Sequence, residues 1–257
     1  MRLFVIVPLY NEELNIPDLF EAFSALERDL SSEYQLSFIL VDDGSSDQTV
    51  PLARAASKNL DVQVLCHATN KGPGAAFATA FAAISGKTTS GDWVITMEGD
   101  NTSRHELIRQ MLVRAREGFD VVLASPYMYG GGFSQTSILR KLLSSGANLV
   151  VKDLLDIQGL LTVSSFFRLY RADALTRLQR VFGVNIVERT GFESMVEMVM
   201  KMTMLNLSIS EVAMRLDSSK RKGKSKMKIL RTIRGYLSLW RSKADWQLQL
   251  LKARNAA

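Results

Sequence analysis

The chain has 257 residues, of which 47% are apolar and 23% charged, a balance typical of a globular protein with a substantial core. A single cysteine, Cys66, excludes an internal disulfide and indicates a reducing compartment, and no run approaches the ~18 uninterrupted apolar residues of a membrane span. The net charge of +6 combines residues 1–214, at −5, with residues 215–257, whose 13 Lys/Arg against 2 Asp/Glu give +11.

Strand and helix patterns alternate through the first half. We expect strands over 3–7, 36–41, 62–66, 93–97 and 121–124, and helices over 17–30, 49–57, 74–84 and 106–116. Strands separated by helices of this length predict an α/β fold, with a mostly parallel sheet flanked by helices and right-handed crossovers.

The second half is less regular after Gly130-Gly-Gly132. The pattern predicts helices over 138–155, 172–180 and 192–205, the last rich in core methionines, and strands over 164–170 and 207–214. A basic loop over 220–226 precedes a stretch with Leu230, Ile233, Leu237 and Trp240 at helical spacing. This predicts a basic amphipathic C-terminal helix. We divide the chain into a domain over 1–218 and a segment over 219–257, packed on the domain or on a membrane surface.

Two of the expected strands end abruptly in acid. Asp42-Asp43 follows one of them, and Glu98-Gly-Asp100 follows another. Ligands of open α/β sheets bind outside the carboxyl ends of the strands. Mg²⁺ and Mn²⁺ prefer hard oxygen ligands and complete their shells with phosphate and water. The two runs therefore predict a metal–nucleotide site, with a solvated turn as the alternative for Glu98-Gly-Asp100.

Two further stretches are weaker signals. Pro8-Leu-Tyr-Asn-Glu12 follows the first strand, where Glu12 could accept hydrogen bonds from a ribose or base, or simply lie in a helix-entry turn. Asn70–Ala76 could direct backbone N–H groups at a phosphate, although a close-packed helix start explains it as well. His67 and His105 lack the spacing of zinc ligands.

With these residues in place, the chain resembles the family 2 glycosyltransferases of the GT-A (nucleotide-diphospho-sugar transferase) fold. Within that family it is similar to the dolichol- and polyprenyl-phosphate mannosyl- and glucosyltransferases, from about Leu3 to Tyr236. An ordered series carries the resemblance: Val7–Glu12, Val41–Asp47, Asn70–Ala75, Met97–Asp100, Ser144–Asn148, Ser165–Arg168, Gly191–Glu197 and Arg221–Lys226.

The resemblance implies roles for individual residues. Nucleotide binding would fall to Pro8, Tyr10, Glu12, Asp42, Asp43 and Lys71, and Mg²⁺ or Mn²⁺ on the diphosphate of a GDP- or UDP-hexose to Glu98 and Asp100. The acceptor phosphate would meet Arg140, Arg221, Lys222 and Lys226, with Asp100 and Arg140 as the catalytic pair. An anionic phosphate oxygen needs little help from a base, so positioning and charge stabilisation would carry a single inverting displacement.

Three departures from the family pattern keep other interpretations open. Glu98 stands where aspartate is usual, Ser125-Pro-Tyr127 lacks a common arginine, and Thr162–Arg168 lacks an acid and a glycine. One alternative is a transferase acting on a glycan, glycolipid or polymer hydroxyl, with Glu193 or Glu197 as candidate base. Another is a non-catalytic nucleotide-sugar-binding homologue.

The leading hypothesis is hexose transfer to a dolichyl or undecaprenyl phosphate by a peripheral enzyme on the cytoplasmic face of the membrane. The basic tail favours an anionic membrane surface as partner, and nucleic acid is disfavoured because aromatic residues do not interleave the positive ones. The sequence also leaves open whether the protein forms a homo-oligomer.

Overall fold

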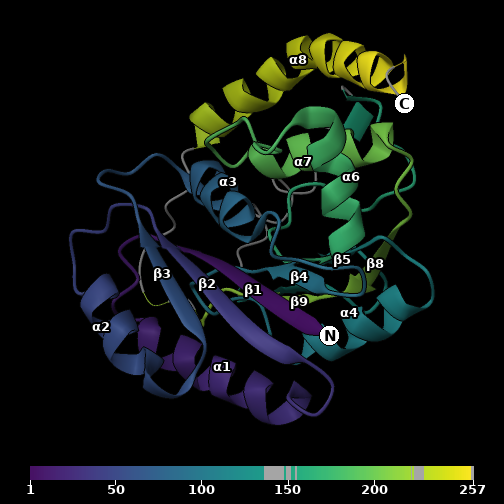
Figure 1. Ribbon diagram of the computed structural model, residues 1–257. Coiled ribbons are helices and arrows are strands. Elements are labelled where there is room, and N and C mark those ends of the chain that lie inside the picture. Colours follow the sequence, from purple (N-terminus) through teal and green to yellow (C-terminus); the bar gives the residue numbers. More distant parts are fainter. Residues whose placement is uncertain (136–147, 149–151, 154, 221, 223–228, 256–257) are drawn as a thin grey trace.

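The computed structural model describes residues 1–135, 148, 152–153, 155–220, 222 and 229–255 (Figure 1). Its centre is a seven-stranded sheet in the order β3-β2-β1-β4-β7-β5-β8. The strands are β1 (Arg2–Leu9), β2 (Gln35–Asp42), β3 (Val62–Cys66), β4 (Trp93–Thr96), β5 (Val121–Ser125), β7 (Arg168–Arg171) and β8 (Ile209–Ala213). The mostly parallel α/β sheet predicted from the sequence is confirmed.

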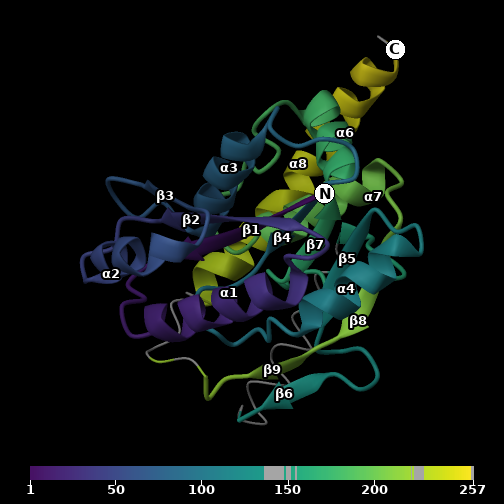
Figure 2. The same cartoon turned by 60° about the horizontal axis from the view of Figure 1, so that its bottom comes forward.

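One strand departs from the parallel pattern. β7 lies between β4 and β5 and runs antiparallel to both, with Arg168 opposite Thr96 and Leu123. A second sheet, also unforeseen, pairs β6 (Gly132–Ser134) with β9 (Arg215–Asp217) in parallel (Figure 2). Both strands of this second sheet are only three residues long, too short for a clear alternation of apolar and polar residues.

Helices cover both faces of the large sheet. α1 (Ile16–Leu30), α2 (Thr49–Ala56) and α4 (Leu107–Arg116) lie on one face, and α3 (Pro73–Ile84), α6 (Ala172–Phe182) and α7 (Ser194–Met204) lie on the other (Figure 1). A 3₁₀ turn over Ser57–Asn59 follows α2. Alternate residues of β1 supply the two cores: Leu3, Val5 and Val7 pack on the α1 side, and Phe4 and Ile6 on the α3 side.

The C-terminal helix α8 (Ile229–Asn255) lies over α6 and α7 (Figure 1). It packs through Leu239 and Trp246, both wholly buried. The apolar residues on its other side are exposed: Leu237, Trp240, Leu248 and Leu251. The helix predicted there is confirmed, but Leu237 and Trp240 do not form its packed face. No described helix is long and apolar enough to cross a membrane.

A buried ion pair lies beneath α8. Lys201 of α7 is wholly buried, and its Nζ lies 2.7 Å from Glu197 and 2.7 Å from Glu188. The ammonium also lies 4.8 Å from the ring centroid of Trp246, whose Nε1 donates to Glu188 at 2.9 Å. The expected core role of the methionines is confirmed, since Met195, Met198, Met200 and Met202 of α7 are buried.

Candidate functional site

The turns that follow β1 and β2 are bonded to each other. The N–H of Asn11 donates to the Ser45 hydroxyl at 2.8 Å, and the N–H of Glu12 donates to the Thr49 hydroxyl at 2.7 Å. The Asp43 N–H donates to the carbonyl of Leu9 at 2.8 Å. The predicted residues Pro8, Tyr10, Glu12, Asp42 and Asp43 therefore gather at one edge of the sheet.

The two adjacent aspartates after β2 differ in what holds them. Asp43 is saturated: Oδ1 accepts from the Lys71 N–H at 2.9 Å and lies 2.7 Å from His67 Nδ1, and Oδ2 accepts from the Gly72 N–H at 2.7 Å. Asp42 accepts from the Ser45 N–H through Oδ2, but its Oδ1 is buried and has no hydrogen-bond partner. A buried acceptor without a donor is costly, so the Asp42 Oδ1 atom has acceptor capacity that the described residues do not use.

Glycines allow these turns to approach closely. Gly44 has φ +74°, and a Cβ there would lie 2.6 Å from the backbone carbon of Thr69. Gly72 has φ +103° and would meet the carbonyl of Thr190 in the same way. Only glycine fits such positions without moving the chain. Lys71, between these turns, is exposed, and its backbone N–H rather than its ammonium carries the contact to Asp43.

Glu98 and Asp100 share the turn after β4. The Thr102 N–H and hydroxyl donate to Asp100 Oδ1 at 3.1 and 2.6 Å, and the Ser103 hydroxyl donates to Glu98 Oε2. A Cβ on Gly99 would lie 2.6 Å from Leu9 Cδ2, so this turn closes directly on the end of β1. Such hydrogen bonds orient carboxylates in the way that outer-shell partners orient metal ligands.

The donor set suits a hard divalent cation that brings its own oxygens. Within the described residues, no group of three or more His, Cys, Asp or Glu side chains is placed to hold a metal ion. The two carboxylates Glu98 and Asp100 would therefore need phosphate or water oxygens to complete the shell, as Mg²⁺ and Mn²⁺ usually have on nucleotides. The residues present fit such an ion.

The predicted acceptor residues fall mostly outside the described part of the chain. Arg140, Arg221 and Lys226 lie there, as does most of Ser144–Asn148. Lys222 is described, and its Nζ lies 2.7 Å from Asp18 on α1. Its side chain is thus paired on the outer surface of α1.

The two candidate bases occupy different environments. Glu197 is wholly buried, accepts the N–H groups of Glu188 and Arg189 at 2.9 Å each, and pairs with Lys201. That arrangement suits the structural role that the methionine-rich helix also allowed. Glu193 stands at the start of α7, where a Cβ on Gly235 of α8 would lie 2.7 Å from its carboxyl carbon.

Arg168 is a residue whose placement the sequence pattern did not single out. It is wholly buried, its Nε and Nη2 donate to the carbonyls of Ser165 and Val163, and its Nη1 is buried without a partner. Burial and the Glu193 carboxylate raise the pKa of nearby Tyr236 to about 12, while Arg168 opposes that rise. An arginine inside the apolar run Phe166–Tyr170 is the signal that could have marked it.

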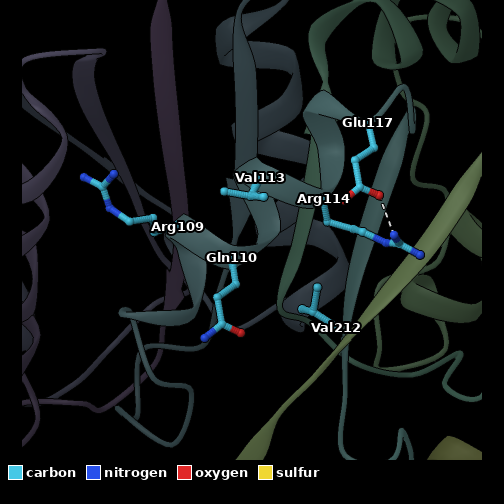
Figure 3. A pocket seen from close by; sticks show the side chains of 6 residues that line it. All are labelled: Arg109, Gln110, Val113, Arg114, Glu117 and Val212. Carbon is cyan, nitrogen blue, oxygen red and sulfur yellow. Dashed lines mark hydrogen bonds and ion pairs between the residues drawn. The ribbon is translucent and has the colours of Figure 1, made fainter.

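Figure 3 shows an open pocket elsewhere, on the outer side of α4 beside β8, where Arg114 pairs with Glu117. It is lined by none of the predicted site residues.

Solved structures share this architecture. Glucosyl-3-phosphoglycerate synthase from Mycobacterium tuberculosis, crystallised with Mn²⁺, UDP-glucose and phosphoglyceric acid, superposes with a TM-score of 0.62 at 18% identity. The match covers 98% of this chain and 79% of that one. The same synthase with phosphoglyceric acid alone gives a TM-score of 0.61. The mostly parallel sheet with its acidic edge is therefore a GT-A fold.

Sequence comparison gives the family. The model described as glycosyl transferase family 2 matches residues 4–178, and the chain belongs to that family. Dolichol-phosphate mannosyltransferase of Pyrococcus furiosus is 30% identical over 208 residues, covering 78% of this chain and 53% of that protein. Undecaprenyl-phosphate 4-deoxy-4-formamido-L-arabinose transferase of Salmonella paratyphi A is 31% identical over 150 residues, 58% of this chain and 42% of that protein. The chain spans about half the length of these curated relatives.

Proposed function

We propose that the chain is a metal-dependent inverting glycosyltransferase that moves a hexose from GDP- or UDP-hexose to a polyprenyl phosphate at the cytoplasmic face of the membrane. The observation that carries this proposal is the convergence of Glu12, Asp42, Glu98 and Asp100 on one sheet edge, with the Asp42 Oδ1 atom lacking a partner. The two polyprenyl-phosphate transferases among the relatives support the choice of acceptor.

Asp42 and Asp43 have different roles in holding the nucleoside. Asp42 Oδ1 offers an acceptor to an N–H of the base, whereas Asp43 fixes the turn at Lys71 and Gly72 against which the nucleotide lies. Asp42→Asn replaces part of that acceptor capacity by a donor, and we expect donor binding to weaken about 10-fold or more. Asp61→Asn is the control, because Asp61 precedes the edge strand β3 at the end of the sheet opposite the site. We expect it to leave donor binding unchanged.

Glu98 and Asp100 would hold the Mg²⁺ or Mn²⁺ on the donor diphosphate. That ion would supply charge stabilisation of the departing nucleoside diphosphate. The chain's own contribution is to orient both carboxylates through Thr102 and Ser103 and to hold their turn against β1. The acceptor phosphate oxygen is already anionic at neutral pH and attacks the anomeric carbon without a protein base, so positioning carries the reaction.

The decisive experiment pairs donors and acceptors. The protein is incubated with Mn²⁺, radiolabelled GDP- or UDP-hexoses and either dolichyl or undecaprenyl phosphate, and the lipid phase is counted. We expect an acid-labile, lipid-soluble product that Asp100→Ala abolishes. If none of the donors yields labelled lipid, the acceptor assignment is overturned. If Asp100→Ala gives the same signal as the parent, the assignment of the site is overturned.

A hydroxyl acceptor is the second candidate, and the position of Glu193 favours it. This carboxylate lies beside Tyr236 and, with burial, raises the pKa of that phenol to about 12. A hydroxyl nucleophile needs a base, which Glu193 would supply. Transfer to a glycan or glycolipid without a phosphate, lost in Glu193→Gln, would replace the polyprenyl-phosphate proposal.

The exposed side of α8 supports the membrane as location. Leu237, Trp240, Leu248 and Leu251 follow one another at steps of three, eight and three residues, which places them on one side of a helix. Exposed Arg234, Arg241 and Lys252 flank this stripe. Because Leu239 and Trp246 already fasten the helix to α6 and α7, the stripe is not needed for packing. Apolar residues flanked by cations suit an anionic lipid surface.

Vesicle binding tests this location. We expect the protein to sediment with vesicles containing anionic phosphatidylglycerol and not with neutral phosphatidylcholine vesicles, and Leu237→Ser with Trp240→Ser to reduce binding about 10-fold or more. Leu52→Ser, which removes an exposed leucine from α2, is the matched control. Equal sedimentation of the α8 variant and the control would refute the assignment of the stripe.

A further inference from the structure

Asn15 joins two segments that are 207 positions apart in the sequence. Its side-chain Oδ1 accepts the Lys222 N–H at 3.1 Å, and its Nδ2 donates to the Lys222 carbonyl at 3.2 Å. One amide side chain thus satisfies both backbone groups of a single residue. Asn15 is wholly buried, so neither bond is shared with bulk water. Two-point contacts of this kind fix orientation as well as position.

The same residue also contacts both acidic turns of the site. Its Nδ2 donates to Glu12 Oε2 at 2.5 Å, and its backbone N–H donates to the Glu12 carbonyl at 2.8 Å. Its carbonyl accepts from Asn101 Nδ2 at 3.0 Å, and Asn101 follows directly on Asp100. The turn after β1, the turn after β4 and the backbone of Lys222 therefore meet at Asn15.

Helix capping does not account for this side chain. Asn15 occupies the N-cap position of α1, where an asparagine normally accepts from an N–H in the first turn, but it makes no side-chain capping bond. Both polar atoms of its side chain are directed instead to Glu12 and Lys222. A residue chosen only to start α1 would not need this arrangement.

We propose that Asn15 is a positioning residue that holds the backbone at Lys222 against the turn after β1, so that Lys222 keeps a fixed place relative to Glu12 and to the turn of Asp100. The positioning role rests on the proposed function, whereas the hydrogen bonds of Asn15 do not depend on it. The Lys222 ammonium takes no part, because it pairs with Asp18 on the outside of α1. Asn15 acts through Glu12 and Lys222 and touches no reacting atom.

We call the two hydrogen bonds between the Asn15 side chain and the Lys222 backbone the clasp. Limited digestion with trypsin tests the clasp without any substrate of the transfer reaction. Cleavage after Lys222 requires the backbone there to open, and its rate follows the open population when reclosing is fast. In Asn15→Ala, which lacks both clasping bonds, we expect cleavage after Lys222 to rise about 10-fold or more relative to cleavage after the exposed Lys58 in the same digest.

Further variants sharpen the outcome. Asp18→Asn removes only the ion pair of the Lys222 side chain, so its cleavage rate should stay within about threefold of the parent. Asn15→Asp places a carboxylate oxygen against Glu12 Oε2 and the Lys222 carbonyl, so cleavage should accelerate at least as much as in Asn15→Ala. Asn15→Gln, which keeps the amide but moves it by one methylene, serves if neither of these variants folds. An unchanged rate in the Asn15 variants, or an equal rise in Asp18→Asn, would overturn the clasp.

Kinetics then test its purpose. At saturating donor, Asn15→Asp should raise the acceptor KM several-fold, whereas Asp18→Asn should not. An unchanged acceptor KM in an Asn15 variant with accelerated cleavage would overturn the positioning role. If no transfer occurs in any variant, the proposed function fails, while the digestion result on the clasp stands on its own.

Discussion

Replacing Lys201 by methionine removes a buried cation and leaves an unbranched apolar side chain in its place. In the parent protein the ammonium is bonded to Glu197, Glu188 and the carbonyl of Ile186, at 2.7, 2.7 and 3.0 Å. Glu188 is partly exposed and can turn to water, but Glu197 is wholly buried. The substitution therefore strands one carboxylate in the core.

Breaking a buried ion pair from one side typically costs about 3–5 kcal/mol. For a chain of this size that free energy corresponds to a fall in Tm of roughly 6–20 °C. Burial already raises the pKa of Glu197 above 4.5, against the opposing effects of Lys201 and the backbone N–H groups, and loss of Lys201 removes one opponent. The folded variant then binds a proton more tightly than the unfolded chain. The stability of the variant should therefore fall as pH rises above 4.5, by up to about 1.4 kcal/mol per pH unit, until pH passes the folded pKa of Glu197.

Urea unfolding at pH 5 and pH 8, followed by tryptophan fluorescence, measures both effects, because Trp246 contacts the ammonium directly. The double variant Lys201→Met with Glu197→Gln keeps an acceptor for the N–H groups of Glu188 and Arg189 without a charge. We expect it to recover about 2 kcal/mol of the loss. A loss below about 1 kcal/mol in the single variant, or no recovery in the double one, would refute the reasoning.

Three more predictions concern the site and its support. Gly44→Ala should lose more stability than Gly86→Ala: both have positive φ and bear the backbone cost of about 1–2 kcal/mol, but only the Cβ at residue 44 meets the Thr69 backbone. Equal melting temperatures would contradict the close approach. Asp92→Asn should cost about 1–3 kcal/mol at pH 7, in urea unfolding. Burial works against ionisation of Asp92, yet donors from Arg2 and Thr89 outweigh it and lower its pKa. This stability is present above pH 3.8 and is lost as pH falls through the lower folded pKa, so the deficit should vanish in acid. Removal of Mn²⁺ with EDTA should abolish the rise in Tm caused by the nucleotide sugar, and Asp100→Asn should show no such rise even with Mn²⁺ present.

The strands and helices of the first half were predictable because each is a run long enough to show its period. α1 begins and ends within a residue of the expected bounds, and β3 matches them. The orientation of β7 was not predictable, since periodicity along a strand carries no information about the direction of its neighbours. The side of α8 that packs against the protein was not predictable either, because helical spacing marks an apolar side of a helix without saying what covers it. The helix packs through Leu239 and Trp246, whereas Leu237 and Trp240 are exposed.

The site, too, was predictable only in part. The convergence of Asp42 and Asp100 followed from strand ends in a parallel sheet. The different duties of Asp42 and Asp43 did not, because they depend on Lys71 and Gly72 arriving from another turn. The clasp by Asn15 joins residues too far apart in the sequence for any spacing rule to relate them.

The reversed direction of β7 has a consequence for how such a protein can change over time. The chain leaves the sheet at Ser125 and returns at Arg168 on the same edge, where Ala124 donates its N–H to the Phe167 carbonyl at 3.0 Å. Everything between these adjacent points starts and finishes at one place, beside the donor turns. The length of that stretch can therefore change without altering the register between β5 and β7, provided that β6 keeps its pairing with β9.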